Sequence, residues 1–415
     1  MNFEILFVCF RISGEESIQT IKKKSAKNFQ WAFGLNKLFL DLTGLWQVEA
    51  TQLGYKNVPV FLTFYRIPIM VFFLVSFIVF PTMHALFRVA PNLTLITENL
   101  TTNCAAVTAT AKIFLLWYNQ DALQPVLREV LRDWSNDRTP WEHRMMTKQA
   151  GYGRIFTISG YTMMLGSMIG FVLAPRIGIN WRTINNITDT GLAVGRVLPI
   201  QTYFACDLTY SPCYEIVYTG HMIAAVFTGI SLSAPDNLFG ALVYHATAQC
   251  RILAVHMSRI VDGVTNDGNN EQLYRTRLRY CAQRHVHLIR FIRGVERTFN
   301  LAILAQIVCL SVIMCGLGFG IIESLDNDDG NHMMQIVILV VSAFTMMVHM
   351  LVYCLANESL LEHSSQFLFS IYNSEWYSIP IKHRKDLLLI MVRSKYPLRL
   401  TAGGFIDLNL NTFLA

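Results

Sequence analysis

Aromatic, sulfur-containing and small polar residues recur at helical spacing along several apolar runs of this chain. Such side chains form the walls of sites for small, mostly apolar molecules, which need aromatic and aliphatic surface with few polar groups. The same faces could instead pack against neighbouring helices, and the sequence alone favours packing for any single residue. The candidate ligand contacts are Thr102, Ala106, Met163, Ser167, Gly170, Phe171, Tyr214, Tyr218, His221, Met222, Met334, Val337, Val341, Ser342 and Thr345.

The apolar runs contain Arg66, Lys112, His221 and His349, and ionisable residues inside a span mark functional sites by default. Arg66 and Lys112 each lie about a third of a span or less from the expected inner face, so we interpret them as extending to the lipid headgroups. His221 and His349 are interpreted as hydrogen-bonded packing residues. Of the two, His221 is the better candidate for ligand contact, because it lies in the outer half of its run.

The sequence carries no catalytic or metal-binding signature. It contains no H-E-x-x-H, no G-x-S-x-G and no Walker phosphate loop. The nine cysteines lack C-x-x-C spacing, which excludes the usual zinc and redox motifs. We therefore predict no enzyme activity, no cofactor and no metal.

Cys206 and Cys213 lie together in a segment that we expect outside the membrane. Most other cysteines fall within or near apolar runs, where cysteine is usually a small buried residue. A disulfide between Cys206 and Cys213 could form in the outer segment, and the sequence leaves their pairing open.

The candidate residues are carried by apolar runs of membrane-span length. A span needs about 20 mostly apolar residues, and 53% of the 415 residues are apolar against 15% charged. Six runs have about that length, and a short seventh run ends the sequence: residues 60–80, 100–118, 155–175, 214–238, 302–322, 334–356 and 405–415. The predicted fold class is therefore an all-α integral membrane protein with seven transmembrane helices.

Lys and Arg residues alternate between the two sides of these runs. Residues 1–58, 119–154, 250–297 and 357–399 hold 28 of them, whereas the intervening loops hold four. Because positively charged loops stay in the cytoplasm, the N-terminus is predicted to be cytoplasmic and the C-terminus extracellular, the reverse of a G-protein-coupled receptor. The net charge of +6 follows the same pattern, so we predict a lipid-membrane protein with no nucleic-acid partner.

N-x-Ser/Thr triplets give a separate test of this orientation. Asn92, Asn99 and Asn186 head such triplets on or beside expected outer loops, and they are glycosylation candidates. Asn357 heads a fourth triplet on the inner side, where we expect it to stay unmodified.

The order of several motifs resembles the insect odorant receptor family. In the C-terminal third these are YNSEWY, the basic patch at residues 382–385, the apolar DLLLIMVRSKYP, the pair Gly403-Gly404 and LNLNTF. Upstream, LPIQTYFACDLTYSPCYEIVY resembles the family's stretch before its fourth helix. Each motif is degenerate, but their order together with the inverted topology is specific, and the resemblance covers nearly the whole chain.

The resemblance implies an odour-tuned subunit of a heterotetrameric, volatile-gated cation channel. Such subunits work with an obligate co-receptor in the plasma membrane of olfactory neuron dendrites. The family implies that a small volatile ligand binds among the outer halves of helices two, three, four and six, which carry the candidate contacts. The short loop at residues 262–272 favours a tuned subunit, because the co-receptor has an extended loop there.

The resemblance also implies a split seventh helix, with an inner part in a cytoplasmic anchor and an outer part lining the pore. We accordingly divide the chain into a cytoplasmic segment, six transmembrane helices, an anchor region and the start of a pore helix: residues 1–58, 59–356, 357–404 and 405–415. Eleven residues from Phe405 make about 16 Å of helix, against about 30 Å of hydrocarbon. We therefore expect a last helix too short to cross, through truncation, alternative splicing or an omitted tail.

Other functions fit this sequence less well. A gustatory-type channel of the same superfamily is disfavoured by the SPCYEIVY segment. A secondary transporter predicts inverted repeats and broken helices, which the sequence lacks, and a membrane enzyme requires a paired catalytic group. The sequence does not name the odorant or fix the subunit stoichiometry.

Overall fold

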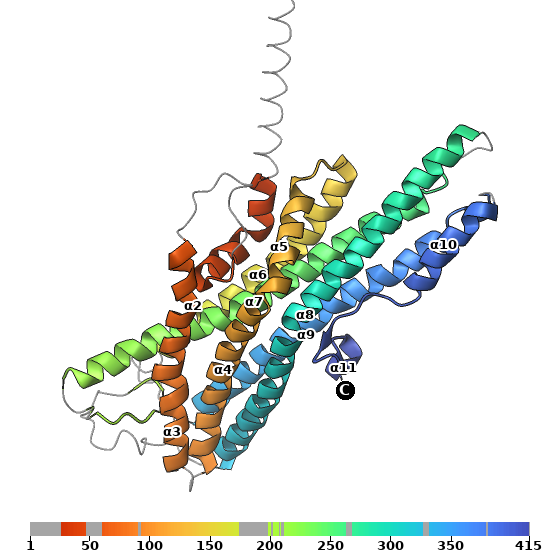
Figure 1. The fold of residues 1–415 in the computed structure, drawn as a ribbon. Coiled ribbons are helices and arrows are strands. Elements are labelled where there is room, and N and C mark those ends of the chain that lie inside the picture. Colours follow the sequence, from red (N-terminus) through yellow and green to blue (C-terminus); the bar gives the residue numbers. More distant parts are fainter. Residues whose placement is uncertain are drawn as a thin grey trace, which may run out of the picture.

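Long helices cover most of the apolar runs in the computed structural model of the protein (Figure 1). The structure describes residues 26–46, 60–89, 93–173, 198–200, 202–206, 208, 211–262, 268–326, 332–378 and 381–414. A first helix covers residues 26–43. The following elements are α2 (Val60–Leu74), the π-helical turn η2 (Val75–Val79), α3 (Phe80–Val89), α4 (Leu93–Tyr118), α5 (Gln120–Ser135), α6 (Pro140–Leu173), α7 (Cys213–Ser258), α8 (Gly268–Asp326), α9 (His332–Tyr372), the 3-10 turn η4 (Trp376–Ser378), α10 (Ile381–Ser394), β1 (Thr401–Ala402), β2 (Ile406–Asp407) and α11 (Leu410–Leu414).

Helices α7, α8 and α9 form the centre of the bundle. Helix α6 packs along α7, α4 packs along α8, and α9 lies against α7. Figure 1 shows α7 diverging from α8 and α9 toward its N-terminal end, with α2, α3 and α4 between these ends in that view. The central helices therefore converge in one half of the molecule and spread in the other.

The helices expose apolar surface at membrane-span length. Among the described residues, four helices are long and apolar enough to cross a membrane: Tyr65–Phe87, Cys213–Ser258, Glu271–Leu325 and Leu339–Tyr372. Their most apolar windows are only 11% to 33% buried, and large side chains such as Phe80, Phe87 and Phe344 face outward. Hydrocarbon rather than water is the solvent that fits these faces. The chain is therefore built as a multi-pass membrane protein.

Several helices differ in length from their apolar runs. Helix α7 reaches Ser258, well past the apolar run at 214–238, and α8 begins at Gly268, well before the run at 302–322. The predicted loop at 262–272 is therefore shorter than expected. Helix α9 continues unbroken to Tyr372, past the predicted boundary at residue 357. Basic and polar residues continue these helices because the extended segments pack against one another instead of against lipid.

Helix α4 begins at Leu93, seven residues before the predicted start of its span. The first turns of α4 are rich in Thr and Asn, so the sequence there is less apolar and the predicted span began too late. These groups satisfy one another inside the bundle: Asn103 Nδ2 donates to Asn99 Oδ1 at 2.7 Å, and Thr82 Oγ1 of α3 lies 2.7 Å from Asn103 Oδ1. Internal hydrogen bonds remove the cost of placing such side chains away from water.

The predicted helix start at Phe405 is wrong. Gly403 and Gly404 have φ values of 65° and 83°, a conformation that favours glycine, and they form a turn between β1 and β2. Helix α11 begins only at Leu410, where Asn409 accepts a hydrogen bond from the Thr412 backbone N–H at 2.7 Å. Helix α11 therefore begins with an Asn cap after a hairpin, not directly after the glycine pair.

Asp133 near the end of α5 is the hub of a buried ionic cluster. Its carboxylate lies 2.6 Å from Arg138, 3.1 Å from Arg284 and 3.2 Å from His245. Burial alone would raise the pKa of Asp133, but the hydrogen bond with His245 and the two arginine charges outweigh burial and hold that pKa well below its usual range. The cluster ties α5 to α7 and α8.

Asp133→Asn is expected to lower the free energy of unfolding by about 3 kcal/mol or more, because breaking a buried ion pair leaves its partners uncompensated. Since the folded-state pKa of Asp133 is depressed, this stabilisation is lost only as the pH falls through that value, so the difference should be constant from about pH 6 to pH 8. Thermal unfolding of detergent-solubilised protein measures it. The control, Glu271→Gln, removes an exposed pair with Arg275 and should change stability little; equal shifts from both variants would contradict the assignment.

Candidate functional site

Buried aliphatic residues and aromatic rings gather where α4, η2 and α7 meet, in the half of the bundle where the central helices spread. The sequence predicts that this half faces outward. We call this group of side chains the outer cluster; its buried members are Ile78, Ala106, Ile200 and Ala224, with Phe77 and Val79 packed against them. Gly220 leaves space for the Phe77 ring, because a Cβ at this glycine would lie only 2.1 Å from it. Phe73 stacks on Phe77 at 5.6 Å and meets Phe227 edge-on at 5.8 Å. Aromatic and aliphatic walls of this kind suit a small apolar ligand.

The segment that precedes α7, which we call the covering segment, closes one side of the outer cluster; its described residues are 198–200, 202–206 and 208. The Tyr203 backbone N–H donates to the Pro81 carbonyl at 3.2 Å, which fixes the segment on α3. Thr202 Oγ1 lies 3.4 Å from His221 Nε2, and the Phe204 ring lies 5.8 Å from the His221 ring. The buried His221 side chain of α7 therefore contacts the covering segment.

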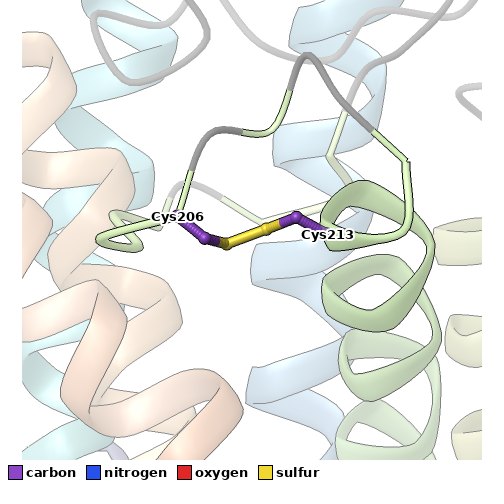
Figure 2. The surroundings of a disulfide bond; sticks show 2 residues. All are labelled: Cys206 and Cys213. Atoms are coloured by element: carbon purple, nitrogen blue, oxygen red, sulfur yellow. A yellow bond between two sulfur atoms is a disulfide. The ribbon is translucent and has the colours of Figure 1, made fainter.

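A disulfide joins the covering segment to the start of α7. Cys206 and Cys213 are bonded, with their Cα atoms 6.5 Å apart (Figure 2). Cys213 is the first residue of α7. Close by, Leu198, Leu208 and Val217 form a second small buried cluster. The pairing that the sequence left open is thus formed in the structure, and it restrains the segment over the site.

The predicted contacts on α4 and α7 lie in or beside this region. Ala106 is 1% exposed and belongs to the outer cluster, and His221 is fully buried. The rings of Tyr214 and Tyr218 stack at 5.8 Å. The half-buried candidates on these two helices are Thr102, Tyr214, Tyr218 and Met222.

The predicted contacts on α6 and α9 do not join the outer cluster within the described residues. Val337 and Val341 are exposed, and the hydroxyls of Ser167 and Thr345 donate to carbonyls of their own helices at 2.9 and 2.8 Å. Met163, Ser342 and Thr345 are half-buried, and Ser167 is exposed. Gly170, Phe171 and Met334 lie on α6 and α9, but their side chains fall outside the described part of the chain.

Sequence reasoning missed Phe77, Thr202 and Phe204 as members of the site. The spacing of four residues between Phe73 and Phe77 would have placed them on one helical face. Thr202 and Phe204 carry no periodic signal, because only the fold of the covering segment brings them to His221.

Lys112 contradicts the prediction that it extends to the headgroups. Its Nζ lies 2.5 Å from Asp236 Oδ1 on α7, and the two side chains are 2% and 5% exposed. The ammonium also lies 3.4 Å from the carbonyl of Leu232. Pro235 precedes the aspartate and has no N–H to donate within α7. A buried partner on a neighbouring helix removed the need for Lys112 to reach the membrane surface.

Two further side chains complete what we call the mid-helix polar cluster. His349 Nε2 on α9 lies 3.5 Å from Asp236 Oδ2, and its Nδ1 lies 3.4 Å from Gln306 Nε2 on α8. The Tyr353 ring packs edge-on against His349 at 5.4 Å. The interpretation of His349 as a hydrogen-bonded residue is therefore confirmed, and Lys112, Asp236, His349 and Gln306 connect α4, α7, α8 and α9.

The guanidinium of Arg66 binds a backbone carbonyl within the protein. Its Nη1 donates to the carbonyl of Asp41 at the end of the first helix, and its side chain is half-buried. This charge therefore has a partner inside the protein, which its interpretation as a residue that extends to the headgroups did not anticipate.

The predicted position of Asn99 on or beside an outer loop is wrong. It lies within α4, is 1% exposed and accepts a hydrogen bond from Asn103. A buried amide inside a helix is a poor glycan acceptor. Asn92 and Asn186 lie outside the described residues. Asn357 is also buried, and its Nδ2 donates to the carbonyls of Leu400 and Leu408.

The hairpin before α11 is fastened to α8 and α9. The Gly403 N–H donates to the carbonyl of Asn300 at 3.1 Å, and Thr401 Oγ1 donates to Glu296 Oε1 at 2.6 Å. The Leu410 N–H, at the start of α11, lies 3.4 Å from Glu358 Oε2 on α9. These hydrogen bonds tie the position of the hairpin and of α11 to α8 and α9.

Comparison with known proteins decides the family. A family model described as 7tm Odorant receptor matches residues 92–415. The chain belongs to the insect odorant receptor family. It is 24% identical over 272 residues to putative odorant receptor 85d and 24% identical over 235 residues to odorant receptor 13a, both of Drosophila melanogaster. These alignments span 64% and 55% of the two relatives and 64% and 54% of this receptor.

The receptor is also similar in fold to solved structures. The olfactory receptor OR5 of Machilis hrabei matches with a TM-score of 0.75 and 14% identity, over 93% of this chain and 94% of that one. The same receptor in complex with eugenol matches with a TM-score of 0.76 and 12% identity, over 94% and 95% of the two chains. At this identity the likeness concerns the fold, and it confirms the helical membrane architecture expected from the sequence.

Peptide mapping without reduction is expected to recover Cys206 and Cys213 of this odorant receptor in one linked species. Cys213→Ser should free the covering segment, so that limited proteolysis cuts between residues 198 and 208 faster than in the wild-type protein. The matched control is Cys315→Ser, which removes an exposed free thiol. Alkylation of both Cys206 and Cys213 in the unreduced wild-type protein would contradict the pairing.

Proposed function

We propose that this receptor is an odour-tuned subunit of a volatile-ligand-gated, non-selective cation channel. The observation that carries the proposal is the buried aromatic and aliphatic surface around Ala106 and His221, in a fold similar over nearly its full length to a receptor solved with eugenol. Eugenol is a small, mostly apolar molecule with few polar groups. A ligand of that class matches an outer cluster whose adjoining polar side chains are Thr202 and His221.

The proposed ligand site lies between α4, η2 and α7, under the covering segment. Phe77, Ala106 and Ala224 supply apolar wall, Phe204 supplies an aromatic face, and His221 with Thr202 offers hydrogen bonding. The candidates on α6 and α9 join the site if those helices approach when ligand binds. A site that contracts around its ligand favours one conformation over another, which is how a ligand shifts a population.

The proposed topology has seven spans, with the N-terminus in the cytoplasm and the C-terminus outside. The distribution of 28 Lys and Arg residues on one side and four on the other supports it. Residues 1–58 then lie in the cytoplasm, residues 59–356 carry the first six spans, and residues 357–404 form the inner anchor. The pore-lining segment starts at α11 in this assignment, since the hairpin occupies residues 401–407.

The proposed partner is the odorant co-receptor in a heterotetramer, in the dendritic membrane of olfactory neurons. Helix α10 supports an assembly role, because it presents Leu388, Leu389 and Val392 at 60% to 70% exposure on a segment of the basic inner half. Apolar surface in such a position suits contact with another subunit. The small hairpin fastened to α8 and α9 then relays their displacement to the pore.

Phe204→Ala and His221→Ala are each expected to raise the odour concentration for half-maximal current about tenfold, corresponding to about 1.4 kcal/mol of binding free energy. Loss of apolar contact at Phe204 and of the buried hydrogen bond at His221 are the physical causes. The measurement is a dose–response curve with the co-receptor, normalised to surface abundance. Val226→Ala, on an exposed part of α7, is the matched control; unchanged curves for both site variants would exclude this location.

Orientation is tested with an epitope tag fused before Met1. Antibody should bind the tag only after the plasma membrane is permeabilised, because the basic segment at residues 1–58 is assigned to the cytoplasm. A co-expressed cytosolic protein controls for membrane integrity. Labelling of the tag on intact cells would reverse the topology.

A further inference from the structure

Lys112 and Asp236 form a buried charge pair that lies outside the outer cluster. The two side chains are 2% and 5% exposed and come from α4 and α7, the helices that also carry the outer cluster. Lys112 follows Ala106 by six residues, about 9 Å along α4 at 1.5 Å per residue. A change in the ligand site that shifts α4 relative to α7 therefore acts directly on this pair.

The same pair is connected to the helices that hold the C-terminal hairpin. His349 links Asp236 to α9 and Gln306 on α8, and Gln306 lies six residues after Asn300, which binds the hairpin at Gly403. The mid-helix polar cluster thus stands between the outer cluster and the hairpin, with one residue from each of the four helices concerned.

Tight packing limits how this region can move. Gly160 of α6 lies so close to α7 that a Cβ there would approach Asn237 Oδ1 to 2.2 Å. Similarly, the Phe156 ring occupies the space beside Gly240, where a Cβ would lie 2.6 Å from it. Around Asp236, separating the pair would leave two charges without compensation in a region of low dielectric. Interactions of this kind favour a few discrete arrangements over continuous sliding.

We propose that Lys112 and Asp236 are positioning residues that hold α4 against α7 in the resting state, and that channel opening requires this pair to rearrange. The proposal rests on the proposed channel function. It assigns the polar cluster a role in the equilibrium between closed and open states, separate from ligand contact.

The two partners are not equivalent. Asp236→Asn leaves the Lys112 ammonium with the Leu232 carbonyl and a neutral amide, so a full charge stays buried. Lys112→Met leaves Asp236 beside His349. The double variant, Lys112→Met with Asp236→Asn, removes both charges. The resting state should therefore be weakened most by Asp236→Asn, less by Lys112→Met, and less by the double variant than by Asp236→Asn alone.

The test compares these three variants with wild type, each with the co-receptor, at matched surface abundance. Asp236→Asn should raise the fraction of maximal current that flows without odour and change the half-maximal odour concentration by about tenfold, a usual size for coupling between sites. The double variant should reverse most of both changes. Arg275→Met with Glu271→Gln, which removes an exposed pair on α8, should change neither. Unchanged odour-free current and half-maximal concentration in both single variants would overturn the proposal, as would losses that follow surface abundance alone.

A second measurement, thiol crosslinking in membranes, does not depend on channel current. It therefore also applies to variants that conduct little or no current. Helix α4 packs along α8, and Cys104 of α4 and Cys309 of α8 are neighbouring free thiols, so a short bifunctional thiol reagent reports the position of α4 in membranes. Lys112→Arg keeps the charge and should crosslink like wild type, whereas Lys112→Met should change the rate. Equal rates in both variants would overturn the positioning role. Absence of odour-evoked current from the wild-type heteromer, with rates that still differ, would instead refute the proposed function.

Discussion

One buried ion pair sets the spacing of the central helices. Lys112 and Asp236 are almost completely removed from water, and a charge in that setting is tolerable only with a partner at contact distance. Because the pair joins α4 to α7 and His349 adds α9, the positions of three helices depend on one set of charges. Helices α6 and α7 also pack closely, with Asn237 against Gly160, and this contact further limits how α7 can move.

On either side of that pair the molecule is built differently. The half where the central helices converge contains the large buried core and a second ionic cluster around Asp133, which fixes α5 on α7 and α8. The half where they spread is held by small apolar clusters, a disulfide and the covering segment, and the most apolar window of α8 is only 11% buried. One firm half and one lightly packed half suit the proposed receptor, whose ligand must enter, be enclosed and be released.

Much of the architecture could be predicted from the sequence, because membrane spans are read from apolar length and the family from an ordered set of motifs. The pairing of Lys112 could not be predicted, since Asp236 is more than a hundred residues away and only the fold brings them together. The same applies to Thr202 and Phe204, whose contact with His221 depends on the covering segment. The start of the last helix was missed because the glycine pair introduces a hairpin before it, and its strands are too short to leave a periodic signal.

We propose that this receptor is a channel subunit whose outer cluster binds a volatile ligand. Recording from cells that express it with the odorant co-receptor, against cells that express each chain alone, tests that claim directly. With a panel of small volatile compounds, the account predicts a cation current that rises with odour concentration in the paired cells, and a different or absent response from either chain alone. A paired response identical to that of the co-receptor alone across the panel would contradict it.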